Sequence, residues 1–351
     1  MTVITDEISR LALKDIVSGL DQEKARWLVD FYYSIQDYRI QATGQERAVL
    51  QDADQGPVAI IEWLADRTRG IEDEVKKALD VFSDEHVPGV WAKSIVGIGP
   101  VLAAGLLAHI DISKARTAGA IWRFAGLDPS VKWVGRQKAD AIVAGVHSGG
   151  GELTDDELVF VAEQIPGMTV EKIKRMLANH RQGPRKATVA NVSAVCALRP
   201  WNDSLKVLCW KIGDSFVKQS SNKNDVYGKV YRDRKAYEVA KNDRGEFATQ
   251  AAEKLAEKRI KDADLKKTLE AGRLPAGQLD LRARRYAVKL FLSHYHQVAF
   301  TVHHGTPPPD PYVISHLKHA HLISPPNWDG ENIVFPKKEK KAKKEGKGKK
   351  S

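Results

Sequence analysis

The sequence has only two cysteines, Cys196 and Cys209, which by themselves make neither a disulfide scaffold nor a zinc site. It has no apolar run that approaches membrane-spanning length. Its N-terminal segment, MTVITDEISRLALKD, is acidic and amphipathic, so we expect no signal peptide there. These absences predict a protein of the reducing cytoplasm, with no membrane partner.

Aromatic residues are also few, at 7% of the chain, and many of the apolar residues are Ala, Leu and Val. The 351 residues give room for two or three domains, and 42% hydrophobic content is enough for a core. No opening of alternating strands and helices is visible. We therefore predict a mainly α fold, in which an N-terminal helical hairpin or coiled coil precedes a second helical region.

Positive charge is unevenly distributed. The formal charge is +10, but the last sixteen residues hold nine lysines and two glutamates. The rest of the chain is therefore only about +3, so any basic surface there must be a local patch. The low-complexity tail from Lys337 is expected to be disordered and to raise affinity for any polyanion by counterion release.

A glycine turn between two apolar segments is the most informative stretch. Gly97-Ile98-Gly99 is followed by Pro100, which suits the first turn of a helix. This is the helix-hairpin-helix pattern, in which backbone N–H groups at a helix N-terminus contact phosphate. A tight turn between two core helices is the alternative. The candidate DNA contacts here are Gly97, Ile98, Gly99, Lys93, Lys114 and Arg116.

The continuation of this stretch, through Ala125-Gly126-Leu127-Asp128-Pro129, resembles the C-terminal domain of transposases of the insertion-sequence 110/116/902 family. The resemblance covers about residues 60–135 and 199–300. It implies DNA transposition or recombination on a DNA partner. The family's RNase H-like domain, with its metal-binding carboxylates, has no counterpart in the first ninety residues. Mg²⁺ is therefore expected only if an RNase H-like partner supplies that domain.

The same resemblance implies a nucleophilic serine shortly after Pro129. Ser130 is the only serine in the run that follows, but Trp133 stands where the serine would align. Ser130 is the candidate catalytic residue, and a turn or cap residue is the alternative. Whether the chain is an enzyme is left open.

Further basic and aromatic residues form a second group of candidates. Arg and Lys contact phosphates, whereas Tyr can stack on bases. A solvated helix face is the alternative for each of them. The group consists of Arg136, Lys138, Tyr231, Arg232 and Arg234.

Histidines are concentrated between residues 294 and 321. No metal site is predicted, because carboxylates and cysteines are not interspersed with them. A zinc site made of His294, His296, His303 and His304 is the weaker alternative. The structural alternative is an arm that packs on the helical core, in which the histidines form hydrogen bonds with phosphates or carbonyls.

Turn signals and composition divide the chain into six parts. Within the third, Thr154 and Glu157 predict a capping box at the start of a helix. The parts are a helical hairpin (1–92), a helix-hairpin-helix DNA-binding region (93–135), an inserted small helical module (136–198), the C-terminal part of a transposase-like domain (199–300), a Pro/His-rich arm (301–336) and the tail (337–351).

The sequence thus predicts a DNA-binding transposase-like protein of a mobile element or phage, located in the cytoplasm. A non-catalytic DNA-binding accessory protein is the first alternative, and a structural helical protein is the second. A structured guide RNA and a homo-oligomer formed through the N-terminal helices are further partners left open.

Overall fold

Helices make up nearly all the regular secondary structure in the computed structural model. The structure describes residues 15, 17–51, 58–147, 149–257, 260–309 and 323–335. These residues form fourteen helices, and their only β-pairing is two isolated bridges. The prediction of a mainly α fold is therefore confirmed, and the described part of the first 92 residues is helical, as expected.

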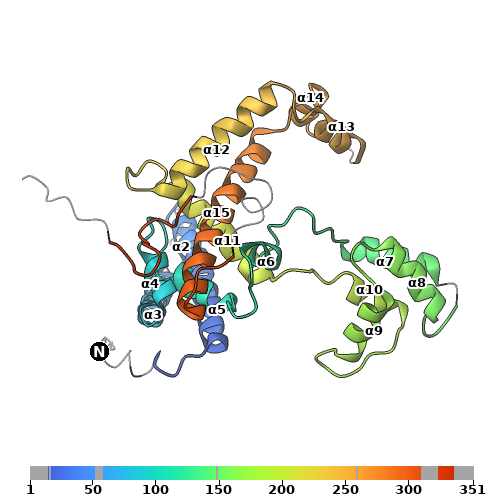
Figure 1. Cartoon of the computed structure of the whole chain (residues 1–351), viewed down its shortest axis with the longest axis horizontal. Coiled ribbons are helices and arrows are strands. Elements are labelled where there is room, and N and C mark those ends of the chain that lie inside the picture. The colour runs from blue at the N-terminus through green and yellow to red at the C-terminus, as the bar shows by residue number, and fades with distance from the viewer. Residues whose placement is uncertain are drawn as a thin grey trace, which may run out of the picture.

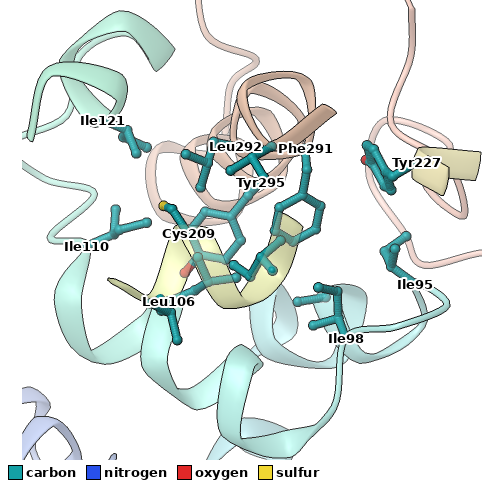
Figure 2. Packing of buried hydrophobic residues seen from close by; sticks show 14 of the residues in the cluster. Ile95, Ile98, Leu106, Ile110, Ile121, Cys209, Tyr227, Phe291, Leu292 and Tyr295 are labelled. Atoms are coloured by element: carbon teal, nitrogen blue, oxygen red, sulfur yellow. The ribbon is translucent and has the colours of Figure 1, made fainter. Parts of the chain in front are cut away.

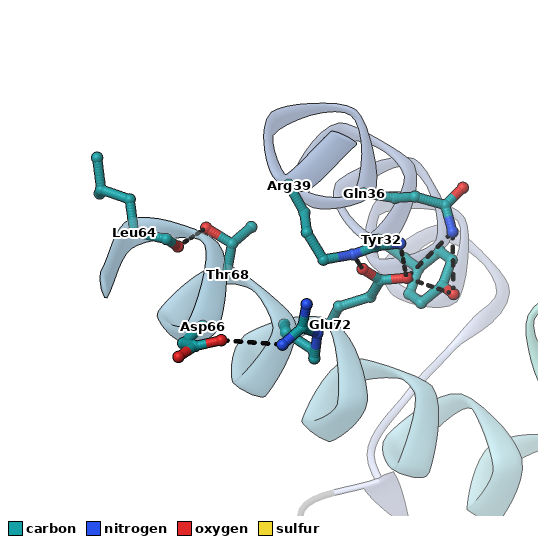
Figure 3. Close-up of polar contacts among 8 residues, drawn as sticks. Tyr32, Gln36, Arg39, Leu64, Asp66, Thr68 and Glu72 are labelled. Carbon is teal, nitrogen blue, oxygen red and sulfur yellow. Dashed lines mark hydrogen bonds and ion pairs between the residues drawn. The ribbon is translucent and has the colours of Figure 1, made fainter. Parts of the chain in front are cut away.

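Two long helices, α2 (Gln22–Gln51) and α3 (Val58–Asp84), pack side by side in opposite directions. Each presents an apolar stripe to the other, and Val29 and Leu79 are among the buried residues between them. A polar cluster is built into the same contact (Figure 3). Glu72 accepts hydrogen bonds from the Tyr32 hydroxyl at 3.0 Å and from Arg39 Nε at 2.5 Å. This pairing satisfies a carboxylate that is only 8% exposed.

The central core joins segments far apart in the sequence. Its helices surround α15 with aromatic and aliphatic side chains (Figure 2). Trp91 stacks on Phe291 with ring centroids 5.8 Å apart, and Phe216 stacks on Tyr227 at 4.9 Å. The helices that contribute are α4 (Val87–Lys93), α5 (Pro100–His109), α6 (Ala118–Phe124), α11 (Asp203–Gln219), α12 (Val226–Asp243) and α15 (Ala276–His304).

Two smaller elements complete this body. The ends of α12 and α15 meet α13 (Ala248–Glu257) and α14 (Ala263–Glu270) at a tip that has its own apolar cluster (Figure 1). Residues 323–335, called the strap here, lie against α4. Trp91 Nε1 donates to the Pro326 carbonyl at 2.8 Å, and Asn327 Nδ2 donates to the Ser94 carbonyl at 3.1 Å.

A four-helix module stands apart from the core (Figure 1). Its buried residues run from Val134 to Cys196 and form a separate cluster. Thr154 and Glu157 form the predicted capping box at its second helix. The helices are α7 (Arg136–Val146), α8 (Asp155–Gln164), α9 (Val170–Ala178) and α10 (Val189–Cys196).

Candidate nucleic-acid interface

The turn between α4 and α5 is fixed by one glycine and one buried side chain. Gly97 has φ +92°, a conformation that favours glycine. Ser215 Oγ, from α11, donates to the Gly97 carbonyl at 2.6 Å. A Cβ added to Gly97 would lie 3.0 Å from Ser215 Oγ. Ile98 is buried in the central core. The side chain of Ile98 therefore anchors the turn and is not available to a ligand.

Gly99 has a different environment, at the mouth of a cavity of about 460 Å³. It is the N-cap of α5, with φ −92°, and a Cβ built on it would meet nothing within 4 Å. No side chain caps this helix, so the N–H groups of Val101 and Leu102 have no partner inside it. The cavity is lined by Gly99, Pro100, Val101 and Leu102 together with Tyr32, Tyr33, Gln36, Lys76, Trp210, Lys211, Asp214, Ser215 and Lys218.

The lining of this cavity, called the hairpin cavity below, carries more positive than negative charge. Its only carboxylate is that of Asp214, which Lys218 contacts at 2.7 Å and Arg284 at 3.1 Å. Hydrogen bonding to Lys218 lowers the pKa of Asp214, so it is ionised and paired. Lys211 lies 3.8 Å from the centre of the Tyr33 ring, and burial lowers its pKa against the opposing effect of Asp37. Lys76 and Lys211 remain to balance an anion.

Lys93, predicted as a DNA contact, is turned toward α3. Its ammonium contacts Asp80 Oδ1 at 2.5 Å and Asp84 Oδ1 at 2.7 Å, and its side chain is only 16% exposed. These ion pairs join α4 to α3. The charge of Lys93 is therefore neutralised within the protein.

Lys114 and Arg116 lie beyond the opposite end of α5 from Gly99. That helix has ten residues, so its ends are about 15 Å apart. Lys114 is 83% exposed and pairs with Asp111 at 2.7 Å. Arg116 is exposed in the same loop. The structure thus separates these two cations from the turn that they were expected to flank.

The remaining basic candidates lie on other helices. Arg136 and Lys138 begin α7 in the four-helix module, and Arg136 pairs with Asp140 at 2.8 Å. On α12, Arg232 is exposed, whereas Arg234 contacts the buried Glu238 at 2.6 Å. None of these residues lines the hairpin cavity.

Tyr231 is buried, with 5% exposure, and its hydroxyl donates to Asp280 Oδ1 at 2.5 Å. Lys235 and Arg284 contact the same carboxylate. Hydrogen bonds from these partners lower the pKa of Asp280 to about 2 although burial opposes the shift. Tyr231 therefore joins α12 to α15 in this conformation.

Ser130, the candidate nucleophile, lies in a turn. Its Oγ donates to Asp128 Oδ1 at 2.7 Å, and its backbone N–H donates to the same oxygen at 2.9 Å. These bonds and the neighbouring Arg123 lower the pKa of Asp128. A carboxylate of lowered pKa is a weak general base. The arrangement has the geometry of an Asx-turn.

The histidines near the end of α15 differ in burial: His294 and His296 are buried, whereas His303 and His304 are exposed. His294 lies 2.7 Å from the Tyr227 hydroxyl and 2.8 Å from the Ile323 carbonyl, and His296 lies 2.8 Å from the Ala115 carbonyl. His303 and His304 are exposed, with ring centroids 4.6 Å apart. Within the described ranges, no three His, Cys, Asp or Glu side chains are grouped to hold a metal ion.

The sequence did not point to the residues that build the hairpin cavity. Lys76 comes from α3, whereas Trp210, Lys211 and Lys218 come from α11, more than a hundred residues after the turn. Trp210, Lys211 and Lys218 occupy positions i, i+1 and i+8 of α11, which lie on one face of a helix. This spacing is the only local signal of the cavity in the sequence. Nothing in the sequence places that face against α5.

The fold and the cavity define a helical protein with a cationic site at a helix N-terminus. Residues 91–145 match the family model described as the Transposase IS116/IS110/IS902 family. This match covers the last three residues of α4, all of α5 and α6 and most of α7, and it confirms the predicted resemblance for this part of the chain. Over residues 91–145 the chain is therefore similar to transposases of this family. Comparisons with curated proteins and with solved structures found no match.

No helix in the part of the chain that the structure describes is both long and apolar enough to span a lipid bilayer.

Proposed function

We propose that the protein binds duplex DNA through the hairpin cavity, as part of a DNA transposition or recombination reaction. The observation that supports this proposal is the coincidence of three features at Gly99: free first-turn N–H groups, open space, and lysines from two other helices. The family match over the same residues points to the same partner.

The chemistry of the contact follows from the lining. The N–H groups of Val101 and Leu102 donate to a phosphate oxygen, and the positive end of the α5 dipole favours the anion. Lys76 and Lys211 balance its charge. Trp210, which is 58% exposed, packs on the adjacent sugar or base. Such binding depends on salt and depends little on sequence.

Outer contacts would extend this footprint. We propose that Lys114 and Arg116 meet a second phosphate of the same duplex, about one α5 length from Gly99. The Lys-rich tail, which lies outside the described residues, adds non-specific affinity.

A series at Gly99 tests the cavity, because this position accepts side chains without strain. Gly99→Asp places a carboxylate over the first-turn N–H groups and repels phosphate. We expect duplex affinity to fall at least about tenfold, since hydrogen bonds to charged groups contribute ~1.5–3 kcal/mol. Gly99→Asn caps the same N–H groups without charge and should weaken binding less. Gly99→Ala leaves the N–H groups free and should bind like the unchanged chain.

The measurement is fluorescence anisotropy with labelled duplexes of two unrelated sequences, at about 0.2 M salt to suppress binding by the tail. Thermal unfolding of each variant provides the control for folding, and Asp or Asn should cap α5 favourably. Equal affinity of folded Gly99→Asp and the unchanged chain would mean that the turn only packs two helices together. The protein would then be a structural helical protein at this site.

Strand transfer is a separate question from binding. If Ser130 is the nucleophile, incubation with nicked or branched DNA should give a protein–DNA adduct that survives denaturing electrophoresis, and Ser130→Ala should abolish it. Binding that depends on Gly99 with no such adduct would identify the non-catalytic accessory protein.

A further inference from the structure

A second cavity, of about 430 Å³, lies where the four-helix module joins the core. We call it the junction cleft. The end of α6, both linkers of the module, the α8–α9 turn and α9 contribute to its walls. Its lining residues are Arg123, Ser130, Val131, Lys132, Trp133, Val134, Ile165, Pro166, Gly167, Met168, Lys172, Met176, Cys196, Leu198, Arg199 and Pro200.

The two linkers of the module are tied together at this cleft by Trp133. Its indole N–H donates to the Ala197 carbonyl at 2.9 Å, which joins the incoming linker to the outgoing one. Trp133 meets Trp201 edge-on, with ring centroids 5.7 Å apart. It nevertheless stays 37% exposed, so part of the indole borders the cleft. These contacts therefore fix Trp133 in place as part of the lining of the cleft.

Another part of the lining is apolar and adaptable. It includes Met168, from the α8–α9 turn, and Met176, from α9, and both are only half-buried against the module's core. Methionine side chains adjust to flat ligands and make favourable contacts with aromatic rings. The lining therefore offers both sulfur atoms and an indole to a planar group.

The rim of the junction cleft is basic, and no acidic side chain lines it. Arg123 and Arg199 each contact one carboxylate outside the lining, at 3.3 and 2.8 Å. Lys172 donates to the Gly167 carbonyl at 2.9 Å, and neither it nor Lys132 makes an ion pair within the described ranges.

Additional cations extend this basic rim over the core. Lys206 lies 3.9 Å from the centre of the Trp201 ring. Burial lowers its pKa, and Arg199 and Arg285 act in the same direction against Asp203. Burial likewise lowers the pKa of Lys289, where Asp128 opposes the shift and Arg285 adds to it. Such crowding of positive charge attracts a polyanion.

We propose that the junction cleft binds an unpaired nucleotide of single-stranded DNA. The base lies between Trp133 and the two methionines, and Lys132 and Lys172 contact the flanking phosphates. This inference rests on the proposed function, because it concerns the same DNA once strands have separated.

The size and lining of the cleft select this occupant. A cavity of 430 Å³ is in the range of small-ligand sites. A DNA duplex does not fit into such a volume, since its major groove alone is about 12 Å wide. An RNA strand would add a 2′-hydroxyl that polar groups recognise. Ser130 is the only hydroxyl or amide side chain in the lining, and its Oγ already donates to Asp128.

Charge reversal within the cleft is the first test. The full chain and Lys132→Glu with Lys172→Glu are titrated against a labelled oligothymidylate of about twelve nucleotides. We expect the double reversal to weaken binding about tenfold or more, because two phosphate contacts are lost. The matched control is Lys174→Glu with Arg175→Glu, which makes the same charge change on exposed residues of α9 outside the cleft. It should have little effect.

Removal of the aromatic wall is the second test. Trp133→Ala should weaken binding of the oligomer about tenfold, because base stacking on an aromatic ring is lost. Circular dichroism and thermal unfolding establish whether the linkers remain ordered. If Trp133→Ala does not fold, the charge-reversal pair decides the question alone.

Comparison of two DNA forms separates this inference from the proposed function. Gly99→Asp should weaken duplex binding and leave oligothymidylate binding unchanged, while the cleft reversal should do the opposite. Equal loss from the cleft pair and the α9 control pair, or no loss from either, would overturn the cleft while leaving the hairpin cavity intact. Tighter, Trp133-dependent binding of an oligouridylate would overturn the assignment to DNA. Duplex binding that is insensitive to Gly99→Asp would count against the proposed function alone.

Discussion

Gly97 and Gly99 are two residues apart and have different steric requirements. Gly97 has φ +92° and lies against Ser215, whereas Gly99 has φ −92° and faces open space. Gly97→Ala should therefore destabilise the protein by about 1–3 kcal/mol, because an L side chain rarely adopts that conformation. Gly99→Ala should change the free energy of unfolding by less than about 0.5 kcal/mol. Urea denaturation of the two variants measures the difference, and equal losses would contradict it.

Buried histidines should make stability depend on pH. Burial lowers the pKa of His109 to about 4, and it lowers the pKa of His294 to about 4 although the Ile323 carbonyl opposes the shift. Their pKa in the unfolded chain is about 6.5. Stability is thus fully present above about pH 6.5 and falls as the pH drops toward 4, because the unfolded state takes up the protons first.

The expected slope is at most about 1.4 kcal/mol per pH unit for each histidine. Urea midpoints between pH 7 and pH 5 measure it. His303→Gln, which alters an exposed ring, should leave the slope unchanged, whereas His294→Gln should reduce it. A slope that His294→Gln does not alter would mean that this histidine titrates alike in both states.

At the level of the helices, α5 separates two sets of groups that the sequence placed together. Gly99 is at its N-terminus, and Lys114 and Arg116 follow its C-terminus. Lys114→Glu with Arg116→Glu should barely change thermal stability, since both side chains are exposed. It should weaken duplex binding about equally for all sequences and reduce the salt slope, because phosphate contacts carry no base identity.

Duplex length gives this experiment its control. A duplex too short to reach from the hairpin cavity past the other end of α5 should bind the double variant and the unchanged chain alike. A longer one should distinguish them. Loss of affinity for both lengths alike would mean that these cations act through the general field of the protein and not through a second contact.

Across the whole molecule, the sequence predicted the helices better than the site. The sequence predicted an N-terminal helical hairpin, and α2 and α3 pack side by side in that region. Thr154 and Glu157 predicted a capping box because that motif is local. The glycine turn was found for the same reason. Each of these features depends on residues within a few positions of one another.

Contacts between distant helices were not predictable in this way. Lys93 is near the turn in sequence, yet its partners Asp80 and Asp84 lie on α3 and neutralise its charge. Lys76 and Lys211 are distant in sequence but line the cavity. Charge alone does not reveal which lysines are paired, because pairing is decided by helix packing.

The strap gives the basic tail a fixed origin. Val334 donates to the Asn327 carbonyl at 3.0 Å, and Asn327 donates to the carbonyl of Ser94, three residues before Gly97. These two hydrogen bonds connect the last described residues, which end at Phe335, to the segment that leads into the turn. A tether that starts beside the segment leading into the turn would raise the effective concentration of lysines around DNA bound at the hairpin cavity. The same tail attached to the far end of α12 would carry identical charge, but it would add much less to the lifetime of that complex.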